Sequence, residues 1–159
     1  MFAKKSISWI FSVLLVIVTL IGSAAFRFDA RVASTITVNS TADNTTHDGS
    51  CTLREAITNA NADLDTTSGD CSAGSGTDTI VFASNLGTAT ITLVSTLPDI
   101  GDADGLTIDG SNHITVNGND SVRVLKAVAP QTLQNISISH GNAGDRGLDW
   151  HAGIHKRQG

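Results

Sequence analysis

The sequence is short of basic residues, and this shortage restricts the partners it can bind. Between positions 32 and 144, 12 acidic residues are opposed by only three basic ones: Arg54, Arg123 and Lys126. A protein that neutralises nucleic-acid phosphates needs a basic patch or stripe. We therefore expect no nucleic-acid partner.

Tyrosine is absent, proline occurs twice, and lysine is rare after the first five positions. Threonine, asparagine, serine, glycine and aspartate are abundant instead. Such a polar composition can indicate disorder, but short β-branched runs recur along the chain. The 159 residues therefore predict one domain that is rich in β-strands.

The N-terminal segment at positions 1–25 carries side-chain charge only at Lys4 and Lys5. A largely apolar stretch follows at positions 7–21, and small residues come after it, ending at Ala25. This pattern predicts a secretory signal peptide at residues 1–25 and a secreted or cell-surface protein. The alternative is an uncleaved membrane anchor, because the uncharged segment approaches the ~20 residues of a transmembrane helix. Its shorter apolar centre favours cleavage, so membrane contact is expected only through an uncleaved signal, and residues 26–34 are interpreted as a linker.

Only two cysteines are present, Cys51 and Cys71. An even number in an exported chain indicates a disulfide. Closing a loop of this length would contribute about 3 kcal/mol to stability in the chain-entropy model. Two free thiols are the alternative, and a metal site built from two cysteines is less favoured.

Residues 35–39 alternate polar and apolar side chains, which is the pattern of a half-buried strand. Turn residues separate further short strands that we expect at 79–82, 89–94, 106–109, 114–116, 122–125 and 133–138. Asp-Gly and Asn-Gly pairs among those turns could form hairpins. An antiparallel sandwich and a solenoid therefore both fit the pattern.

An internal repeat favours the solenoid. Residues 106–110 and 135–139 look like the same strand, with Ile108 and Ile138 at equivalent positions. The two shorter strands expected between them would make three strands per turn, as in a triangular parallel β-helix. Apolar residues at every second position would fill its interior.

Residues 51–61 change to a helical period. The apolar side chains fall at i, i+3, i+4 and i+7 on one helix face: Leu53, Ala56, Ile57 and Ala60. Ser50 or Thr52 could cap this helix, and Glu55 lies near its N-terminus, where the helix dipole favours a carboxylate. We therefore expect one short amphipathic helix among the strands.

The same segment carries a family resemblance. Residues 51–57, CTLREAI, closely resemble the CSLREAI motif at the N-terminus of many bacterial surface proteins, with Thr52 in place of serine. The similarity covers about residues 34–144. It implies a mainly β fold, a right-handed parallel β-helix with a short N-terminal capping helix that contains Leu53, Arg54, Glu55, Ala56 and Ile57. It implies little about activity, because a scaffold does not fix a function.

The predicted domain organisation follows from this resemblance. Residues 35–78 would form an N-terminal cap with the helix and the disulfide loop, and residues 79–144 the first β-helix windings. The helix would cover the apolar end and the strand edges that a first winding exposes. Arg54 and Glu55 are interpreted as an ion pair or a cap rather than as catalytic groups.

The β pattern ends at residue 144, so we expect the solenoid to be incomplete. Residues 145–159 are interpreted as an atypical tail that is truncated, frame-shifted or a genuine short end. His151 and His155 have a spacing that could bind a metal, with Asp149 and His140 as further ligands. No helix is predicted there, so a solvated tail is favoured.

Three aspartates before Gly105 resemble an oxygen-rich calcium loop: Asp99, Asp102 and Asp104. Their spacing differs from that of an EF-hand, and the bidentate glutamate is missing. A polar turn is therefore the favoured interpretation, and the sequence predicts no metal and no cofactor.

A polysaccharide-cleaving site could be assembled from Asp109, Asp120, Arg123 and His140, but no spacing requires it, and we predict no catalytic residues. The expected function is an exported β-helix module with a structural or adhesive role, as the N-terminal fragment of a larger protein. Its partner would be a surface polysaccharide or a host or cell-surface ligand, with self-association through the exposed solenoid end. The alternatives are the front end of a polysaccharide lyase or hydrolase and a non-functional truncated product.

Overall fold

The structure is a computed structural model that describes residues 31–143. The predicted signal peptide at residues 1–25 and the tail at residues 145–159 lie outside the described residues. The elements are, in chain order, β1 (Thr35–Val38), α2 (Leu53–Ala62), β2 (Asp78–Phe82), the 3-10 helix η1 (Ser84–Leu86), β3 (Ala89–Thr92), β4 (Leu106–Asn117) and β5 (Gln131–Ser139). Within residues 31–143, no helix is long and apolar enough to cross a membrane.

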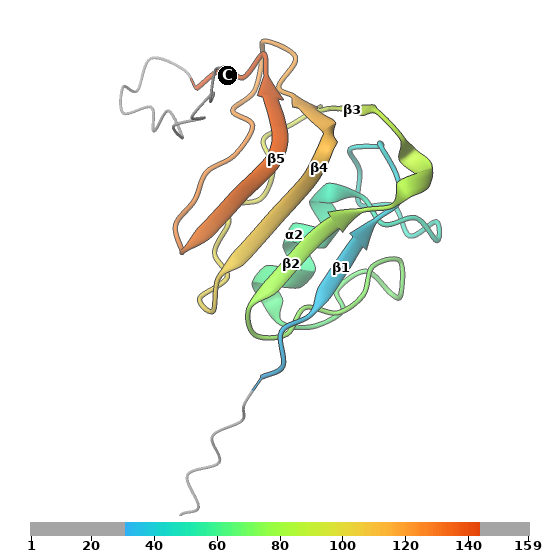
Figure 1. The fold of residues 1–159 in the computed structure, drawn as a ribbon, viewed down its shortest axis with the longest axis vertical. Coiled ribbons are helices and arrows are strands. Elements are labelled where there is room, and N and C mark those ends of the chain that lie inside the picture. The colour runs from blue at the N-terminus through green and yellow to red at the C-terminus, as the bar shows by residue number, and fades with distance from the viewer. Residues whose placement is uncertain (1–30, 144–159) are drawn as a thin grey trace, which may run out of the picture. The chain divides into compact units, whose positions relative to one another are not determined.

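The strands form one five-stranded sheet in which every pairing is parallel. Its order is β1-β2-β4-β3, and β5 pairs with β4 (Figure 1). The long strand β4 is shared, because its first part pairs with β2 and its last part with β3. β5 follows both parts of β4 along the opposite edge. The antiparallel sandwich that the turn residues allowed is therefore excluded for these strands.

The register stacks apolar residues of successive strands on one another. Ile36 of β1 lies beside Ile80 of β2, which lies beside Ile108 of β4, and Leu133 of β5 continues this column. A second column joins Ile91, Val116 and Ile138. Side chains alternate between the two faces of a strand, so these columns form the buried face of the sheet. All but the two β5 members belong to the buried core.

The turn expected between two short strands at residues 109–112 is instead a bend inside the continuous strand β4. Gly110 to His113 of β4 lie opposite the single residue Asn135 of β5. Ser111 and Asn112 adopt positive φ angles of 51° and 63°, so the chain turns without leaving the sheet. A Cβ on Gly110 would lie 2.6 Å from the Asn135 carbonyl oxygen, which explains the glycine.

Two further expectations are wrong. Residues 122–125 form no strand; Val124 is buried in the core, but Val122 closes a turn onto the Gly118 carbonyl. Ile108 and Ile138 are not equivalent, because Ile108 pairs with Leu133 and Ile138 pairs with Val116. The repeat is therefore shorter than the separation of Ile108 and Ile138 suggested. The bend within β4 caused the error. β4 has apolar residues on both sides of the bend, and residues 135–139 pair with the part after the bend, not with residues 106–110 before it.

The expected helix forms as α2 and packs against β1 and β2 on the apolar face of the sheet (Figure 1). Its apolar face is buried as the helical period predicted: Leu53, Ala56, Ile57 and Ala60. These side chains join the strand residues in one core. The packing confirms the amphipathic interpretation of this segment.

Candidate functional site

The N-terminus of α2 is fixed by a reciprocal cap. The Thr52 hydroxyl accepts a hydrogen bond from the Glu55 amide at 3.2 Å, and the Glu55 carboxylate accepts one from the Thr52 amide at 3.0 Å. Both residues are buried. This capping box satisfies amides that the first helical turn would otherwise leave unpaired. Of the two caps considered from the sequence, Thr52 is the one used, and Glu55 has the capping role.

Arg54 fastens α2 to two separate loops. Its Nε and Nη2 atoms donate to the Asp43 carboxylate at 2.8 and 3.0 Å. Its guanidinium also donates to the carbonyl oxygens of Ser95 and Thr96, each at 2.8 Å. The Arg54 side chain is 13% exposed and that of Asp43 is 2% exposed. The guanidinium is therefore engaged on both sides by protein acceptors, which confirms the ion-pair interpretation of Arg54.

Two asparagines on α2 hold further loops. The buried Asn59 donates to the Ser72 carbonyl at 3.0 Å and accepts from the Thr66 amide at 2.8 Å. Asn61 donates to the Asp99 carbonyl and accepts from the Gly101 amide, both at 2.8 Å. Each asparagine side chain thus pairs with backbone N–H and C=O groups of a loop, which would otherwise lack these hydrogen-bond partners.

Cys51 and Cys71 form the disulfide that the sequence predicted, with Cα atoms 4.8 Å apart. The bridge ties Cys51, which precedes the N-cap of α2, to the loop that Asn59 holds. Asp70, next to Cys71, accepts hydrogen bonds from the amides of Asp48 and Gly49 at 3.1 and 3.0 Å. The helix, the disulfide and these side chains therefore form one structural unit around residues 43–72.

The three aspartates that resembled a calcium loop in the sequence, Asp99, Asp102 and Asp104, do not come together as one group. The Asp99 carboxylate pairs with Lys126 instead of joining Asp102 and Asp104. Asp63, which ends α2 in a left-handed conformation, takes its place beside the other two. One carboxylate oxygen from each of Asp63, Asp102 and Asp104 lies within 4.8 Å of the others. Among the described residues this is the one group of three or more possible metal-ligand side chains whose ligand atoms lie close together.

The residues considered for polysaccharide cleavage have structural contacts. The Asp109 carboxylate accepts from the Ser111 amide at 2.8 Å and from the side chains of Asn135 and Gln134 at 3.1 and 3.0 Å. The Ser111 amide, followed by the Asn135 side chain, lowers the pKa of the Asp109 carboxyl against a smaller opposing effect of burial. Asp109 is therefore an ionised group that holds the β4 bend against β5.

Of the other members of that group, Asp120 and Arg123 lie in the turn after β4, and His140 directly follows β5. The Asp120 amide donates to the His140 carbonyl at 2.8 Å, and Arg123 donates to the Ala143 carbonyl at 3.3 Å. These contacts join the turn to the end of β5. His151, His155 and Asp149 lie outside the described residues.

Sequence reasoning missed the roles of Asp43, Asn59, Asn61 and Asp63. The two asparagines carried a usable signal, because asparagine at two positions of one helix, away from its apolar face, indicates side chains that bond to backbone. Asp43 and Asp63 carried none, since their partners come from loops far along the chain. Comparisons with protein-family models, with curated proteins and with solved structures find no match for this chain.

Proposed function

We propose that this chain is the N-terminal end of an exported, cell-surface right-handed parallel β-helix with a structural or adhesive role. The observation that carries the proposal is the register of the sheet. β2 and β3 together run beside the two arms of β4, and β5 runs beside both arms on the other edge. In a solenoid, each winding stacks on the one before it at the ~4.8 Å strand spacing. Three successive windings, with β1 as the start, account for these pairings.

The position of α2 supports its role as a cap. It packs on β1 and β2, the strands that begin the stack, and buries Leu53, Ala56 and Ile57 there. A first winding without such cover would expose apolar side chains and invite aggregation. The resemblance of residues 51–57 to the CSLREAI motif points to the same role. The hydrogen bonds that Arg54 and Asn61 make to loop residues would hold the capping helix on the loops that join the first windings.

The other end of the stack is incompletely covered by the described residues. Among residues 31–143, β5 pairs with β4 alone, and Leu133, Ile136 and Ile138 are only partly buried. Ile108, the partner of Leu133, is by contrast 1% exposed. A further winding of a longer protein, or a second copy of the chain, would cover these side chains in the same way. The proposal therefore includes an incomplete solenoid that can self-associate at β5.

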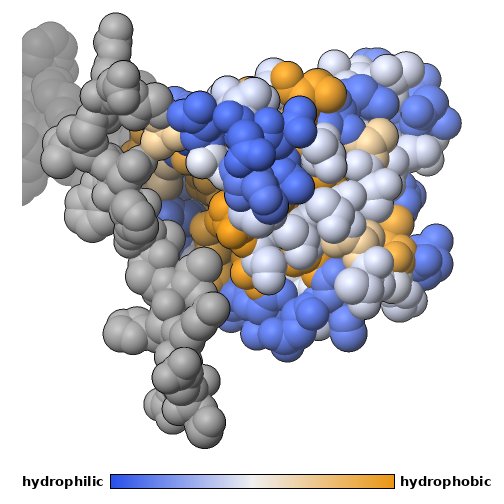
Figure 2. Space-filling model, turned by 90° about the horizontal axis from the view of Figure 1, so that it is seen from above, coloured by the Kyte–Doolittle hydropathy of each residue, from blue (hydrophilic) through white to orange (hydrophobic). Residues whose placement is uncertain are grey.

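The outer face of the sheet suggests how such a module would adhere. Four threonines occupy the same position in successive strands, Thr35, Thr79, Thr107 and Thr132. They alternate with the buried isoleucine column, so their hydroxyl groups face outward at the ~4.8 Å strand spacing. Figure 2, which shows the molecule from above, has hydrophilic residues and residues of intermediate hydropathy with smaller apolar areas between them. Regular hydroxyl groups on a chain with net charge −5 favour a neutral surface polysaccharide as the partner.

Cosedimentation with crystalline cellulose and with chitin tests the adhesive role. We expect the chain to bind at least one of them, and the double variant Thr79→Val/Thr107→Val to bind several-fold more weakly, because valine keeps the shape but lacks the hydroxyl. Thr90→Val/Thr115→Val is the matched control, since it alters a threonine pair on the β3 arm. Equal binding by both double variants, or no binding of the wild type beyond that of an unrelated protein, would refute adhesion through this face.

Export is tested separately by expressing the full chain in a bacterium. The proposal predicts protein in the periplasm or medium that begins near Phe26, because cleavage is expected after Ala25. Mass spectrometry of the exported and cytoplasmic fractions reads the N-terminus directly. An intact chain that begins at Met1 and stays in the cytoplasm would contradict export while leaving the fold untouched.

A further inference from the structure

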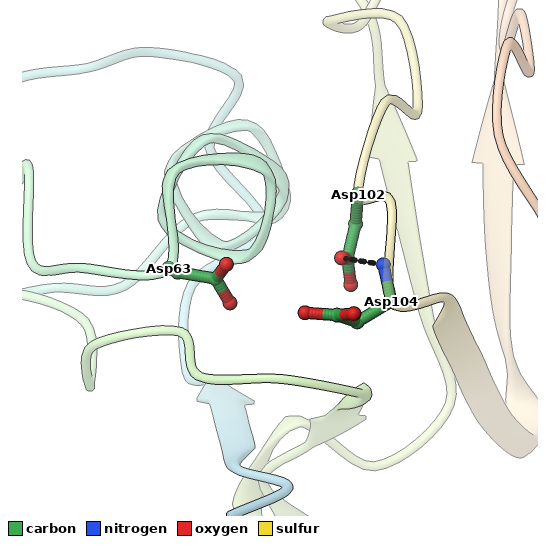
Figure 3. Close-up of side chains that lie close together, drawn as sticks. All are labelled: Asp63, Asp102 and Asp104. Carbon is green, nitrogen blue, oxygen red and sulfur yellow. Dashed lines mark hydrogen bonds between the residues drawn. The ribbon is translucent and has the colours of Figure 1, made fainter. Parts of the chain in front are cut away.

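The acidic cluster of Asp63, Asp102 and Asp104 joins the end of α2 to the loop that precedes β4. Asp63 is the C-cap of α2, and the other two lie just before Leu106. Figure 3 shows the three carboxylates converging on one space between the helix end and the loop. No two of the contributing oxygen atoms are more than 4.8 Å apart.

Two buried oxygens in this space have no hydrogen-bond partner. Asp102 is only 2% exposed, and while its Oδ1 accepts from the Asp104 amide at 2.9 Å, its Oδ2 is buried and unpaired. Asp63 Oδ1 is buried and unpaired as well. A buried carboxylate oxygen without a donor costs free energy. A positive ligand in this space would remove that cost for both residues at once.

Within residues 31–143, little positive charge lies near the cluster. Arg31 forms an ion pair with Asp63 through Oδ2, which leaves Oδ1 without a partner, and the Arg31 side chain is 52% exposed. Lys126, on the neighbouring loop, is engaged by Asp99. The partly solvated guanidinium of Arg31 therefore pairs with one of the three carboxylates, Asp63.

We propose that Asp63, Asp102 and Asp104 bind a calcium ion. Calcium takes six to eight oxygen ligands at about 2.3–2.6 Å, so two of its ligands can lie up to about 5 Å apart. Magnesium, with ligands at about 2.0–2.1 Å, limits that separation to about 4.2 Å. The cluster contains only carboxylate oxygens, and its 4.8 Å span fits the larger ion. Water completes the coordination on the exposed side, where Asp104 lies.

The ion gives the fold a second fastening between α2 and the loop before β4. Asn61 already binds Asp99 and Gly101 of that loop. Calcium between Asp63 and the aspartates at 102 and 104 would lock the same two segments at a further point. The site depends only on these contacts and stands apart from the proposed adhesive role.

Calorimetric titration of the chelator-treated full chain with CaCl2, together with thermal unfolding, tests the site. We expect one calcium per chain with a Kd on the order of 10⁻⁴–10⁻³ M, the range of weak extracellular sites. A hundredfold excess of CaCl2 over Kd should raise Tm by roughly 10 °C. Asp102→Asn, which keeps the acceptor for the Asp104 amide, should weaken binding at least tenfold. The exposed Asp104→Asn should do so as well, and it covers the case in which the buried variant fails to fold.

Two controls sharpen the result. Asp99→Asn removes a nearby acidic residue outside the cluster and should leave the calcium response unchanged. Arg31→Ala should tighten calcium binding, because the guanidinium and the ion compete for Asp63. A wild-type chain whose Tm does not respond to 10-fold and 100-fold increases of CaCl2 would overturn the proposal, as would an unaltered response in Asp104→Asn. An equal Tm shift with MgCl2 would overturn the assignment to calcium.

Discussion

Replacing Arg54 with alanine should destabilise the domain more than any loss of a surface ion pair. The substitution leaves Asp43, whose side chain is 2% exposed, with a single backbone donor, the Val94 amide at 2.7 Å. It also removes the donors of the Ser95 and Thr96 carbonyls. Breaking a buried ion pair from one side costs about 3–5 kcal/mol. For a domain of this size, that loss lowers Tm by roughly 12–20 °C.

Thermal unfolding followed by circular dichroism measures the effect, and the chain supplies a matched control. Lys126 and Asp99 form an ion pair whose side chains are 47% and 46% exposed, so Lys126→Ala should cost less than about 1 kcal/mol. Arg54→Met combined with Asp43→Leu should recover part of the loss, because no buried charge is left unpaired. If Arg54→Ala changed Tm no more than Lys126→Ala does, the buried Arg54–Asp43 pair would add nothing to stability beyond a surface pair, and the reasoning would be refuted.

Three further predictions concern the disulfide, the β4 bend and the pH response. Reducing the Cys51–Cys71 bridge should cost about 3 kcal/mol, seen as a lower urea midpoint with dithiothreitol than without it. Gly110→Ala should lower Tm by several degrees because its Cβ would meet the β5 backbone, whereas Gly101→Ala, with its nearest neighbour 3.7 Å away, should not. The pKa of Asp109 is lowered on folding, so its contribution to stability is present above its ordinary value of 3.8 and is lost as the pH falls through the folded pKa. Urea titrations between pH 2 and 6 should therefore show a weaker acid loss for Asp109→Asn, and an unchanged slope would contradict that role.

The local patterns of the sequence were sufficient to predict the elements that form within short windows. The structure has the helix at residues 53–60, the Thr52 cap and the Cys51–Cys71 bridge. The first two depend on residues that are close in sequence, and the bridge follows because the chain has only two cysteines. The parallel sheet was expected from an internal repeat and from the family resemblance, since the turn residues alone also allowed hairpins. Register could not be predicted in the same way, because it depends on where β4 bends.

The acidic cluster shows what sequence spacing misses. Asp99, Asp102 and Asp104 are close in sequence, so they suggested a loop site together. The third carboxylate is instead Asp63, which the left-handed C-cap of α2 turns toward the loop. No spacing rule joins a helix end to a loop so far along the chain, because packing of the helix on the sheet places them together. Asp99 is engaged by Lys126 instead, because the parallel bridge between Ile100 and Ala127 places the two residues beside each other.

The parallel stacking of β4 and β5 is the central claim, and methyl NOE spectra of the full chain test it most directly. The register predicts contacts between the methyl groups of Ile108 and Leu133 and between those of Val116 and Ile138. An antiparallel pairing of the same two strands would exchange the partners. Contacts between Ile108 and Ile138 together with contacts between Val116 and Leu133 would contradict the stacked windings, and with them the proposed β-helix.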